Sequence, residues 1–223
     1  MEQAPGSEQG RPARVKITAG IEDDLLAIVG ILNYTAASSI ARFETRPVSV
    51  AERCDWFSQF CTTGPYRLVV ARGGDQVLGY ACSQRYRDLE AFRETVEVSI
   101  ALDVSSRGQG VGTALYRALF DSLAVEPSVH VALAGIALPN DASVALHRKF
   151  GFTEVGTFRE YAIKNRQYIS SVWMQRFCHA AGAAAGADLA AVRGQQPGGE
   201  QDQLDGNVEH DTMGQHAEPS PVS

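Results

Sequence analysis

Long apolar runs are missing from this sequence of 223 residues. None approaches the roughly 20 apolar residues that a transmembrane helix needs, and the polar segment 1–14 contains no hydrophobic stretch of the kind found in secretory signals. We therefore expect a cytoplasmic protein without a membrane partner. The hydrophobic content of 44% is nevertheless sufficient for a substantial core.

Cysteine is also scarce. The four cysteines form no Cys-x-x-Cys pair and no ligand cluster with histidine; they are Cys54, Cys61, Cys82 and Cys178. This spacing argues against a zinc framework, so we expect no bound metal. The simplest interpretation is that the thiols are reduced and act as small buried apolar side chains.

An excess of basic charge is absent as well. The net charge is −6, but residues 14–177 carry 18 Lys and Arg against 17 Asp and Glu, whereas residues 178–223 carry one arginine against seven acids. The acidity therefore belongs to the C-terminal segment. A balanced remainder offers no basic footprint for nucleic acid, which favours a small molecule as the partner.

The most informative stretch covers residues 95–119. In 95–102 apolar side chains alternate with polar or small ones, which predicts a strand that packs on one face and aims Glu97 away from it. Residues 107–112 then carry three glycines at alternate positions, directly before an apolar helical pattern. Without Cβ atoms, backbone N–H groups can converge on an anion at the positive end of that helix. The stretch predicts a pyrophosphate cradle.

Other nucleotide-binding loops fit this stretch less well. A P-loop requires a lysine before Thr113, and Gly112 stands there instead. The Rossmann fingerprint needs wider spacing between its second and third glycines and a place near the first strand of its domain. A serine hydrolase is disfavoured because no Gly-x-Ser-x-Gly elbow occurs. A glycine-rich turn that binds nothing remains the alternative.

The rest of the chain divides into a central domain and two polar ends. Low apolar content predicts disorder for residues 1–13 and for the acidic tail 178–223, and leaves a domain at 14–177. Within it, helices are expected at 22–32, 49–60, 110–123 and 141–150, and strands at 14–17, 66–71, 76–82, 95–102, 129–137, 153–158 and 170–174. Ser49 and Glu52 form a capping box, and Asp141 is the expected N-cap of the last helix. Residues 35–47 are expected to be irregular.

This order of elements has a known counterpart. With Arg-x-x-Gly-x-Gly at 107–112 and His-x-x-x-Gly-Phe at 147–152, the chain resembles the GNAT superfamily of N-acetyltransferases. The resemblance implies an α/β fold of the α+β type, with a mixed, mostly antiparallel sheet flanked by helices. It also implies acetyl-CoA as the co-substrate.

A closer resemblance, over residues 15–177, is to the phosphinothricin (methionine sulfoximine) acetyltransferases. It rests on segments 39–47, 95–97, 107–112, 138–147, 156–159 and 173–175 and on Lys164. It implies Glu97 and His147 as the catalytic pair, and a homodimer as the possible assembly. The acetyl-CoA contacts that it implies are Ser99, Ile100, Ala101, Arg107, Gly108, Gln109, Gly110, Val111, Gly112 and Asn140.

The implied chemistry suits these residue types. An amine is mostly an ammonium ion at neutral pH, so a carboxylate or imidazole must accept its proton. The departing thiolate then benefits from one acid. The residues do not assign these two steps between Glu97 and His147, but both side chains are expected on the same side of the sheet, beside the thioester.

The acceptor is harder to infer. The resemblance implies a small amino-acid-like primary amine whose acidic groups need cations, with Arg87 as the leading candidate and Tyr86 and Thr95 as pocket walls. Leu89, Arg46 and Ser170 depart from the residues common in the family. A different amine (a protein terminus, polyamine or aminoglycoside) and a regulator that binds acetyl-CoA without turnover remain alternatives.

Overall fold

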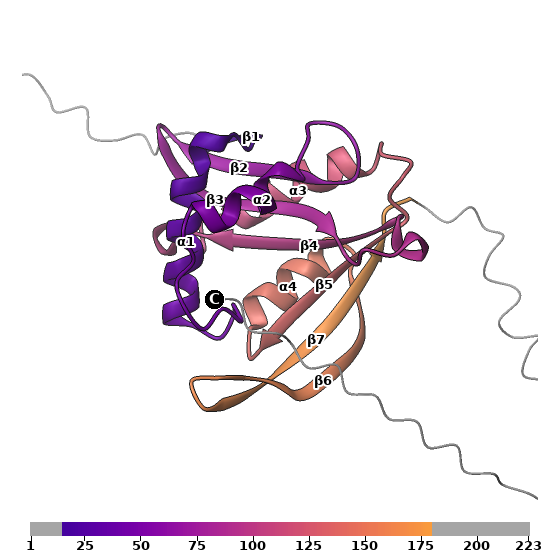
Figure 1. Ribbon diagram of the computed structural model, residues 1–223. Helices are drawn as coiled ribbons and strands as arrows, with labels where there is room; N and C mark the ends of the chain where they lie inside the picture. The colour runs from indigo at the N-terminus through magenta and orange to yellow at the C-terminus, as the bar shows by residue number, and fades with distance from the viewer. Residues whose placement is uncertain (1–14, 180–223) are drawn as a thin grey trace, which may run out of the picture. The chain divides into compact units, whose positions relative to one another are not determined.

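The computed structural model describes residues 15–179, which fold around one seven-stranded sheet (Figure 1). The strand order is β1-β2-β3-β4-β5-β7-β6. The strands are β1 (Lys16–Ala19), β2 (Arg67–Gly73), β3 (Gln76–Arg85), β4 (Thr95–Leu102), β5 (Val131–Leu138), β6 (Thr153–Lys164) and β7 (Gln167–Phe177). Every neighbouring pair is antiparallel except β4 and β5, which run parallel. This mixed sheet confirms the expected fold class.

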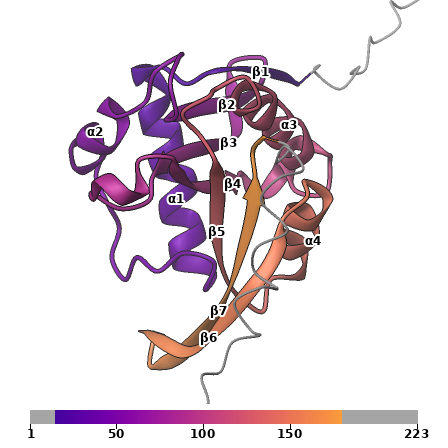
Figure 2. The same cartoon turned by 90° about the vertical axis from the view of Figure 1, so that its right-hand side faces the viewer.

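Helices cover both faces of the sheet (Figure 2). On one face lie α1 (Leu25–Ser38) and α2 (Ala51–Ser58), and on the other lie α3 (Val111–Leu123) and α4 (Asp141–Lys149). Each face has its own apolar cluster, because strand side chains alternate between the two. Three short 3-10 turns, Glu22–Asp24, Glu90–Phe92 and Val104–Ser106, complete the described elements. No helix in this part of the chain is long and apolar enough to cross a membrane.

Most predicted elements are confirmed, with differences at their ends. The strand at 95–102 has the expected bounds, and the capping box exists as predicted: Ser49 N–H donates to Glu52 Oε2 over 2.7 Å, while Glu52 N–H donates to Ser49 Oγ over 3.2 Å. The segment after residue 34 was expected to be irregular, which is wrong for its first part. There α1 continues to Ser38, because Thr35 and Ala36 are buried against the sheet.

The predicted ends of the chain fall almost entirely outside the described residues. Segment 1–13 does so completely, and so does the predicted tail apart from Cys178 and His179. Cys178 is buried, and its N–H donates to the His130 carbonyl over 2.9 Å. The ordered contacts of the domain therefore extend beyond the expected boundary at residue 177.

Candidate active site

The sheet opens between its two parallel strands. Only Thr95, Val96 and Glu97 of β4 pair with β5, although both strands continue for several residues. Beyond Glu97 the other edge of β4 remains bonded to β3, and the other edge of β5 to β7. The two strand edges that face the opening are therefore left without a strand partner. Main-chain amides in such a position can hydrogen bond an extended ligand.

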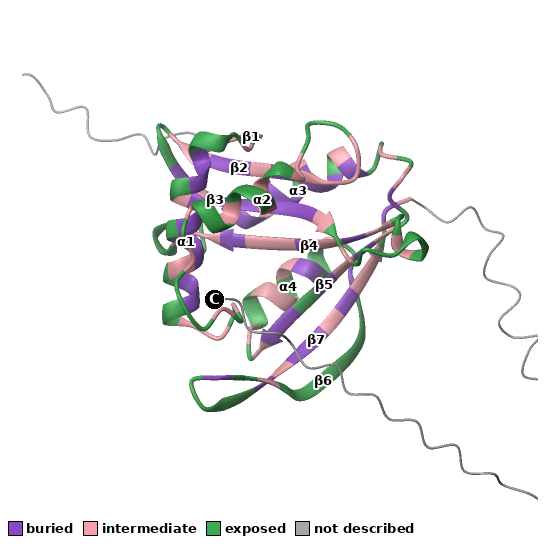
Figure 3. Ribbon diagram, in the orientation of Figure 1, coloured by how far each residue is buried: buried purple, intermediate pink, exposed green. Residues whose placement is uncertain are grey.

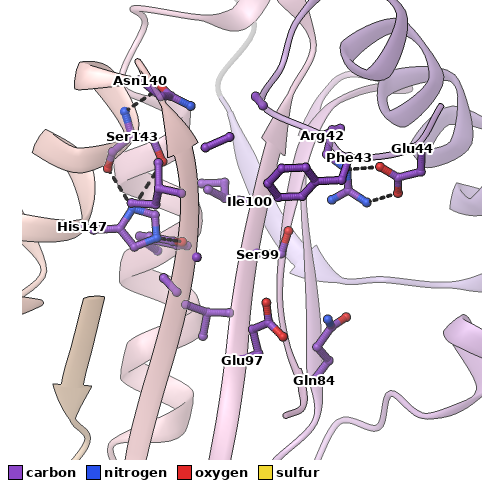
Figure 4. A pocket seen from close by; sticks show the side chains of 17 residues that line it. Arg42, Phe43, Glu44, Gln84, Glu97, Ser99, Ile100, Asn140, Ser143 and His147 are labelled. Atoms are coloured by element: carbon purple, nitrogen blue, oxygen red, sulfur yellow. Dashed lines mark hydrogen bonds and ion pairs between the residues drawn. The ribbon is translucent and has the colours of Figure 1, made fainter. Parts of the chain in front are cut away.

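A cavity of about 510 Å³ occupies this opening (Figure 4). Residues 97–100 of β4 line one wall and residues 134–137 of β5 line the other. Asn140, Ser143 and His147 of the α4 region close one side, and the loop residues 41–44 close the opposite side. Glu97 and His147 thus line one cavity.

The glycine loop borders a second cavity of about 670 Å³. Gly108 and Gly110 have φ angles of +74° and +80°, which favour glycine, and a Cβ on either would meet nothing within 4 Å. Gly110 is also the N-cap of α3 and provides no side-chain cap, so the N–H groups of the first helical turn lack that acceptor. This loop fits a diphosphate, because open amides and the helix dipole favour an anion there.

Most of the expected acetyl-CoA contacts lie along the two cavities. The second cavity is lined by Ile100, Ala101, Arg107, Gly108, Gly110, Gly112 and Asn140, and the first by Ser99. Two of the expected residues, Gln109 and Val111, do not line either cavity with their side chains. The Gln109 side-chain amide donates to the Ser105 carbonyl over 2.6 Å, and Val111 is buried in the core under α3. Any contact that these two residues make with acetyl-CoA in the two cavities therefore comes from their backbone N–H groups.

The start of α4 corrects a further expectation. Asn140, not Asp141, is the N-cap, since its side-chain carbonyl accepts the Ser143 N–H over 3.2 Å. Asp141 occupies the first turn instead, where its charge suits the helix dipole. Asn140 lines both cavities while capping the helix.

Glu97 lies on the α1 and α2 side of the sheet. It shares the strand face of Ala101, which belongs to the apolar cluster under α1. Burial raises the pKa of Glu97 above its usual range, and the positive charge of Arg42 opposes part of this effect. In Figure 4 the Glu97 carboxylate lies on the side of β4 that faces the loop with Arg42 and Glu44.

His147 reaches the cavity from the other side. It is 3% exposed and packs among Tyr116 and Phe152, both members of the apolar cluster under α3. The expectation that Glu97 and His147 share one side of the sheet is therefore wrong. Both side chains nevertheless line one cavity, because the gap between β4 and β5 connects the two faces of the sheet at this point.

The expected acceptor residues lie elsewhere. Tyr86, Arg87 and Thr95 line neither cavity. The Tyr86 ring packs against Phe92 and Trp173, and the Arg87 guanidinium stacks over Tyr86 and Phe92. These contacts hold the 86–92 segment together beyond the end of β3, so we correct the expectation that it forms the pocket wall.

A different arginine, Arg42, lines the cavity and can take the cationic role that was expected of Arg87. Arg42 donates from Nε and Nη2 to Glu44 over 3.1 and 2.5 Å, and Arg53 also pairs with Glu44 over 2.8 Å. Lys164 at the far end of β6 fixes this loop by donating to the carbonyls of Ala36, Ser39 and Arg42 over 2.5, 3.0 and 2.7 Å. Segment 39–47 and Lys164 stood out in the sequence, but nothing there indicated that they touch.

Sequence reasoning also missed Tyr116. Its hydroxyl lies 2.7 Å from His147 Nε2, and the residue lines the same cavity as Glu97. In the sequence Tyr116 is one more apolar-facing position of an amphipathic helix. Only its pairing with a histidine 31 positions away distinguishes it.

Comparisons with known proteins identify a family and relatives that this chain resembles. The sequence model of the acetyltransferase (GNAT) family matches residues 31–152. A phosphinothricin N-acetyltransferase from Streptomyces coelicolor is 39% identical over 166 residues, which cover 74% of this chain and 96% of that protein. An L-methionine sulfoximine/L-methionine sulfone acetyltransferase from Pseudomonas paraeruginosa is 33% identical over 163 residues, covering 71% and 94%.

A solved structure has a similar fold. The crystal structure of a phosphinothricin acetyltransferase from Sinorhizobium meliloti, in complex with acetyl-CoA, aligns with a TM-score of 0.67 and 32% identity. The alignment covers 73% of this chain and 88% of that one.

Proposed function

Because the chain belongs to the acetyltransferase (GNAT) family, we propose that its two adjoining cavities bind acetyl-CoA and a small amino-acid-like amine for direct acetyl transfer. The protein is an acetyl-CoA-dependent N-acetyltransferase, and the acceptor is of the phosphinothricin or methionine sulfoximine type. The observation that carries the proposal is the opening between β4 and β5, which joins the glycine loop at one end to Glu97 at the other.

We assign the two catalytic steps to the two faces of the sheet. Glu97 accepts the proton of the attacking amine, because it lines the cavity beside the Arg42 loop, and burial raises its pKa towards that of a useful base. His147 serves the leaving-group side, where the α4 side chains meet β5. Bound acetyl-CoA supplies the activated thioester. Main-chain groups of Ser99, Ile100 and Ala101 contact it along β4, and backbone N–H groups of residues 107–112 together with Asn140 hold its phosphate end.

Arg42 is the proposed partner of the acid group of the acceptor. Its Nε and Nη2 bond Glu44, whereas Nη1 has no protein partner among residues 15–179. A guanidinium fixed on one edge and open on the other suits a carboxylate or phosphinate. Glu97 lines the same cavity, so an acceptor acid group at Arg42 leaves its amine near the base.

A thiol-release assay tests the proposed function. Acetyl-CoA is mixed with phosphinothricin, methionine sulfoximine, an amino acid and its decarboxylated amine, a polyamine, and a peptide with a free N-terminus. We expect release with the acid-bearing small amines, and slower release with the decarboxylated partner of the matched pair. Release with the peptide or the polyamine alone would reassign the acceptor, and release with none of them would make the protein a binding module.

The diphosphate site predicts a specific glycine requirement. Gly110→Ala should raise the KM for acetyl-CoA by about 10-fold or more, because a Cβ at φ +80° forces the loop to change shape. Gly151→Ala is the matched control: its φ is +81°, a Cβ there also meets nothing within 4 Å, and it lines neither cavity. Steady-state kinetics should show that Gly151→Ala leaves the KM unchanged while both variants lose similar thermal stability. Equal acetyl-CoA KM values in the two variants would show that the glycine loop does not bind acetyl-CoA.

We propose that two copies of the chain associate through β6. This edge strand is exposed along almost its whole length (Figure 3), and it carries large apolar side chains on the outside, including Val155, Phe158 and Ile163 at 61%, 57% and 60% exposure. Such an edge favours pairing with another chain. Phe158→Asp should weaken the dimer at least about 10-fold in sedimentation velocity, whereas Leu26→Asp on the exposed side of α1 should not. A wild-type monomer at all concentrations would contradict this assembly.

We also propose a cytoplasmic location. Within the described residues all four cysteines are free thiols, and two of them, Cys54 and Cys61, are exposed, contrary to the expectation that they are buried. Exposed thiols persist in a reducing compartment.

A further inference from the structure

Tyr116 and His147 form a buried pair whose proton positions follow from their partners. His147 Nδ1 lies 2.8 Å from the Ser143 carbonyl oxygen, which can only accept, so Nδ1 carries the ring hydrogen. In the neutral imidazole Nε2 is then an acceptor, and the Tyr116 hydroxyl donates to it over 2.7 Å. Burial lowers the pKa of His147 and raises the pKa of Tyr116 well above its usual value. Both side chains are therefore neutral near pH 7.

These bonds leave no nitrogen of His147 for a group that enters the cavity. One nitrogen is used by the Ser143 carbonyl and the other by Tyr116. Tyr116 is 0% exposed but is one of the residues that line the cavity, and its hydroxyl is the one polar atom of its side chain. Edge contacts with Phe120 and Phe150 hold the ring in place. A negative charge that develops in the cavity next to this pair can therefore be met by the Tyr116 O–H.

We infer that Tyr116 is a further catalytic residue, whose hydroxyl turns from His147 Nε2 to the departing sulfur, and that His147 is the positioning residue that aims it. The inference rests on the proposed function, and it refines the role of His147 on the leaving-group side. It gives the α3 helix a chemical role besides its N-terminal anion site.

The acetyl-transfer step is balanced without a proton supplied by His147. The C–N bond forms, the C–S bond breaks, and the electron pair of the C–S bond stays on sulfur. The proton lost by the amine goes to Glu97. Tyr116 donates a hydrogen bond to the sulfur anion and keeps its proton, because a phenol with a raised pKa is a weaker acid than a thiol of pKa about 8.5. CoA leaves as the thiolate and is protonated by water.

The Tyr116 hydroxyl changes its hydrogen-bond acceptor from His147 Nε2 to sulfur only as the reaction proceeds. The new hydrogen bond therefore stabilises the transition state and not the bound substrate. A thioester sulfur is a poor acceptor, so the hydroxyl remains with His147 while the substrate is intact. Once sulfur carries charge, the charge-assisted hydrogen bond is the stronger of the two. An interaction that strengthens only as charge develops raises kcat and leaves the substrate KM nearly unchanged.

Binding measurements test the contact without turnover. The Kd values of CoA and of desulfo-CoA are compared by calorimetry between pH 6.5 and 10 for the wild type, Tyr116→Phe and Tyr66→Phe. Tyr66 packs against the same apolar cluster but lines neither cavity, so its phenylalanine variant is the matched control. We expect the thiol of bound CoA to ionise about one pH unit higher in Tyr116→Phe than in the wild type, a roughly 10-fold weaker hold on the thiolate. Desulfo-CoA affinity should be equal in all three.

Turnover provides the second readout. Tyr116→Phe should lower kcat by about 10- to 100-fold with the acetyl-CoA KM within about 3-fold, and Tyr66→Phe should not change either value. The amide oxygen of glutamine can stand where Nε2 stands, so His147→Gln should keep most of the activity that His147→Phe loses. If His147 itself delivers a proton to sulfur, glutamine and phenylalanine must be equally inactive.

Two results would overturn the inference: an unchanged thiol ionisation in Tyr116→Phe with wild-type kcat, or equal loss in His147→Gln and His147→Phe. Neither affects the proposed function, which stands as long as the wild-type protein releases thiol with an amine. Conversely, a wild-type protein that releases none defeats the proposed function, while the CoA and desulfo-CoA comparison still decides whether Tyr116 meets the sulfur. If Tyr116→Phe fails to bind desulfo-CoA, the two His147 variants decide the question.

Discussion

Replacing Glu97 with glutamine is expected to lower kcat by roughly 10²- to 10⁴-fold, the usual contribution of a general base. Glutamine has nearly the same shape but cannot accept the proton of the amine. The KM for acetyl-CoA should change by less than about 3-fold, since Glu97 lies away from the glycine loop and does not line its cavity. Glu94→Gln, an exposed carboxylate one residue before β4, is the matched control and should retain full activity.

The pH dependence of kcat/KM distinguishes the titration of Glu97 from the titration of the acceptor amine. Burial raises the pKa of Glu97, so its carboxylate gains a proton, and the enzyme loses kcat/KM, as pH falls through a value above the usual range for glutamate. That limb of the profile should stay in place when acceptors of different amine pKa are compared, and it should vanish in Glu97→Gln. A limb that moves with the acceptor alone would show that Glu97 is not the base.

The same substitution has an opposite effect on stability. The pKa of Glu97 is higher in the folded than in the unfolded protein. Such a glutamate lowers the free energy of unfolding once the pH exceeds its pKa in the unfolded protein. Glu97→Gln removes this penalty, so thermal stability at pH 7 should be equal to or higher than that of the wild type. An active site commonly trades stability for chemistry in this way.

Lys164→Met is expected to cost about 3 kcal/mol of unfolding free energy. Lys164 is 4% exposed, and its ammonium group donates to three backbone carbonyls at the end of α1 and in the loop after it. Methionine keeps the buried stem but leaves those carbonyls without their donor, at about 1–3 kcal/mol for each buried group, and removes a cation from the C-terminal end of a helix dipole. For a domain of this size we expect a fall in Tm of roughly 6–12 °C.

Lys164→Met should also weaken acceptor binding, because one of the three carbonyls that lose their donor belongs to Arg42. We expect the acceptor KM to rise in Lys164→Met while the acetyl-CoA KM stays within about 3-fold. Lys16→Met on β1, at an exposed position, is the control for the substitution and should change neither Tm nor KM. A Tm within about 1 °C of the wild type would show that the three hydrogen bonds are not stabilising.

Local patterns in the sequence account for much of the fold. The alternation in residues 95–102 defines β4, and Ser49 with Glu52 marks the start of a helix through a reciprocal hydrogen bond. The glycine loop was recognisable because its backbone requirement is set within six residues. Such signals need no knowledge of the rest of the chain.

The features that the sequence did not predict depend on contacts between segments that are far apart in the chain. The opening after Glu97 exists because β4 stops pairing with β5, a strand that begins at Val131, 29 positions after the end of β4. Lys164 reaches carbonyls 122 to 128 residues away, and Tyr116 meets His147 across 31. Periodicity and motif spacing contain no information on such contacts, so Arg42 was overlooked, and Arg87 was favoured because it is a cation in the segment that precedes Glu97.

Hydrogen–deuterium exchange with and without CoA tests most directly whether the ligand lies in the gap between β4 and β5. We predict added protection in residues 98–101, where every second N–H group lies on the unpaired edge of β4, and in residues 107–114 of the glycine loop and the first turn of α3. Protection confined to another cavity, such as the acidic one lined by Asp24, Arg72 and Asp103, with no change in these two segments, would contradict this account.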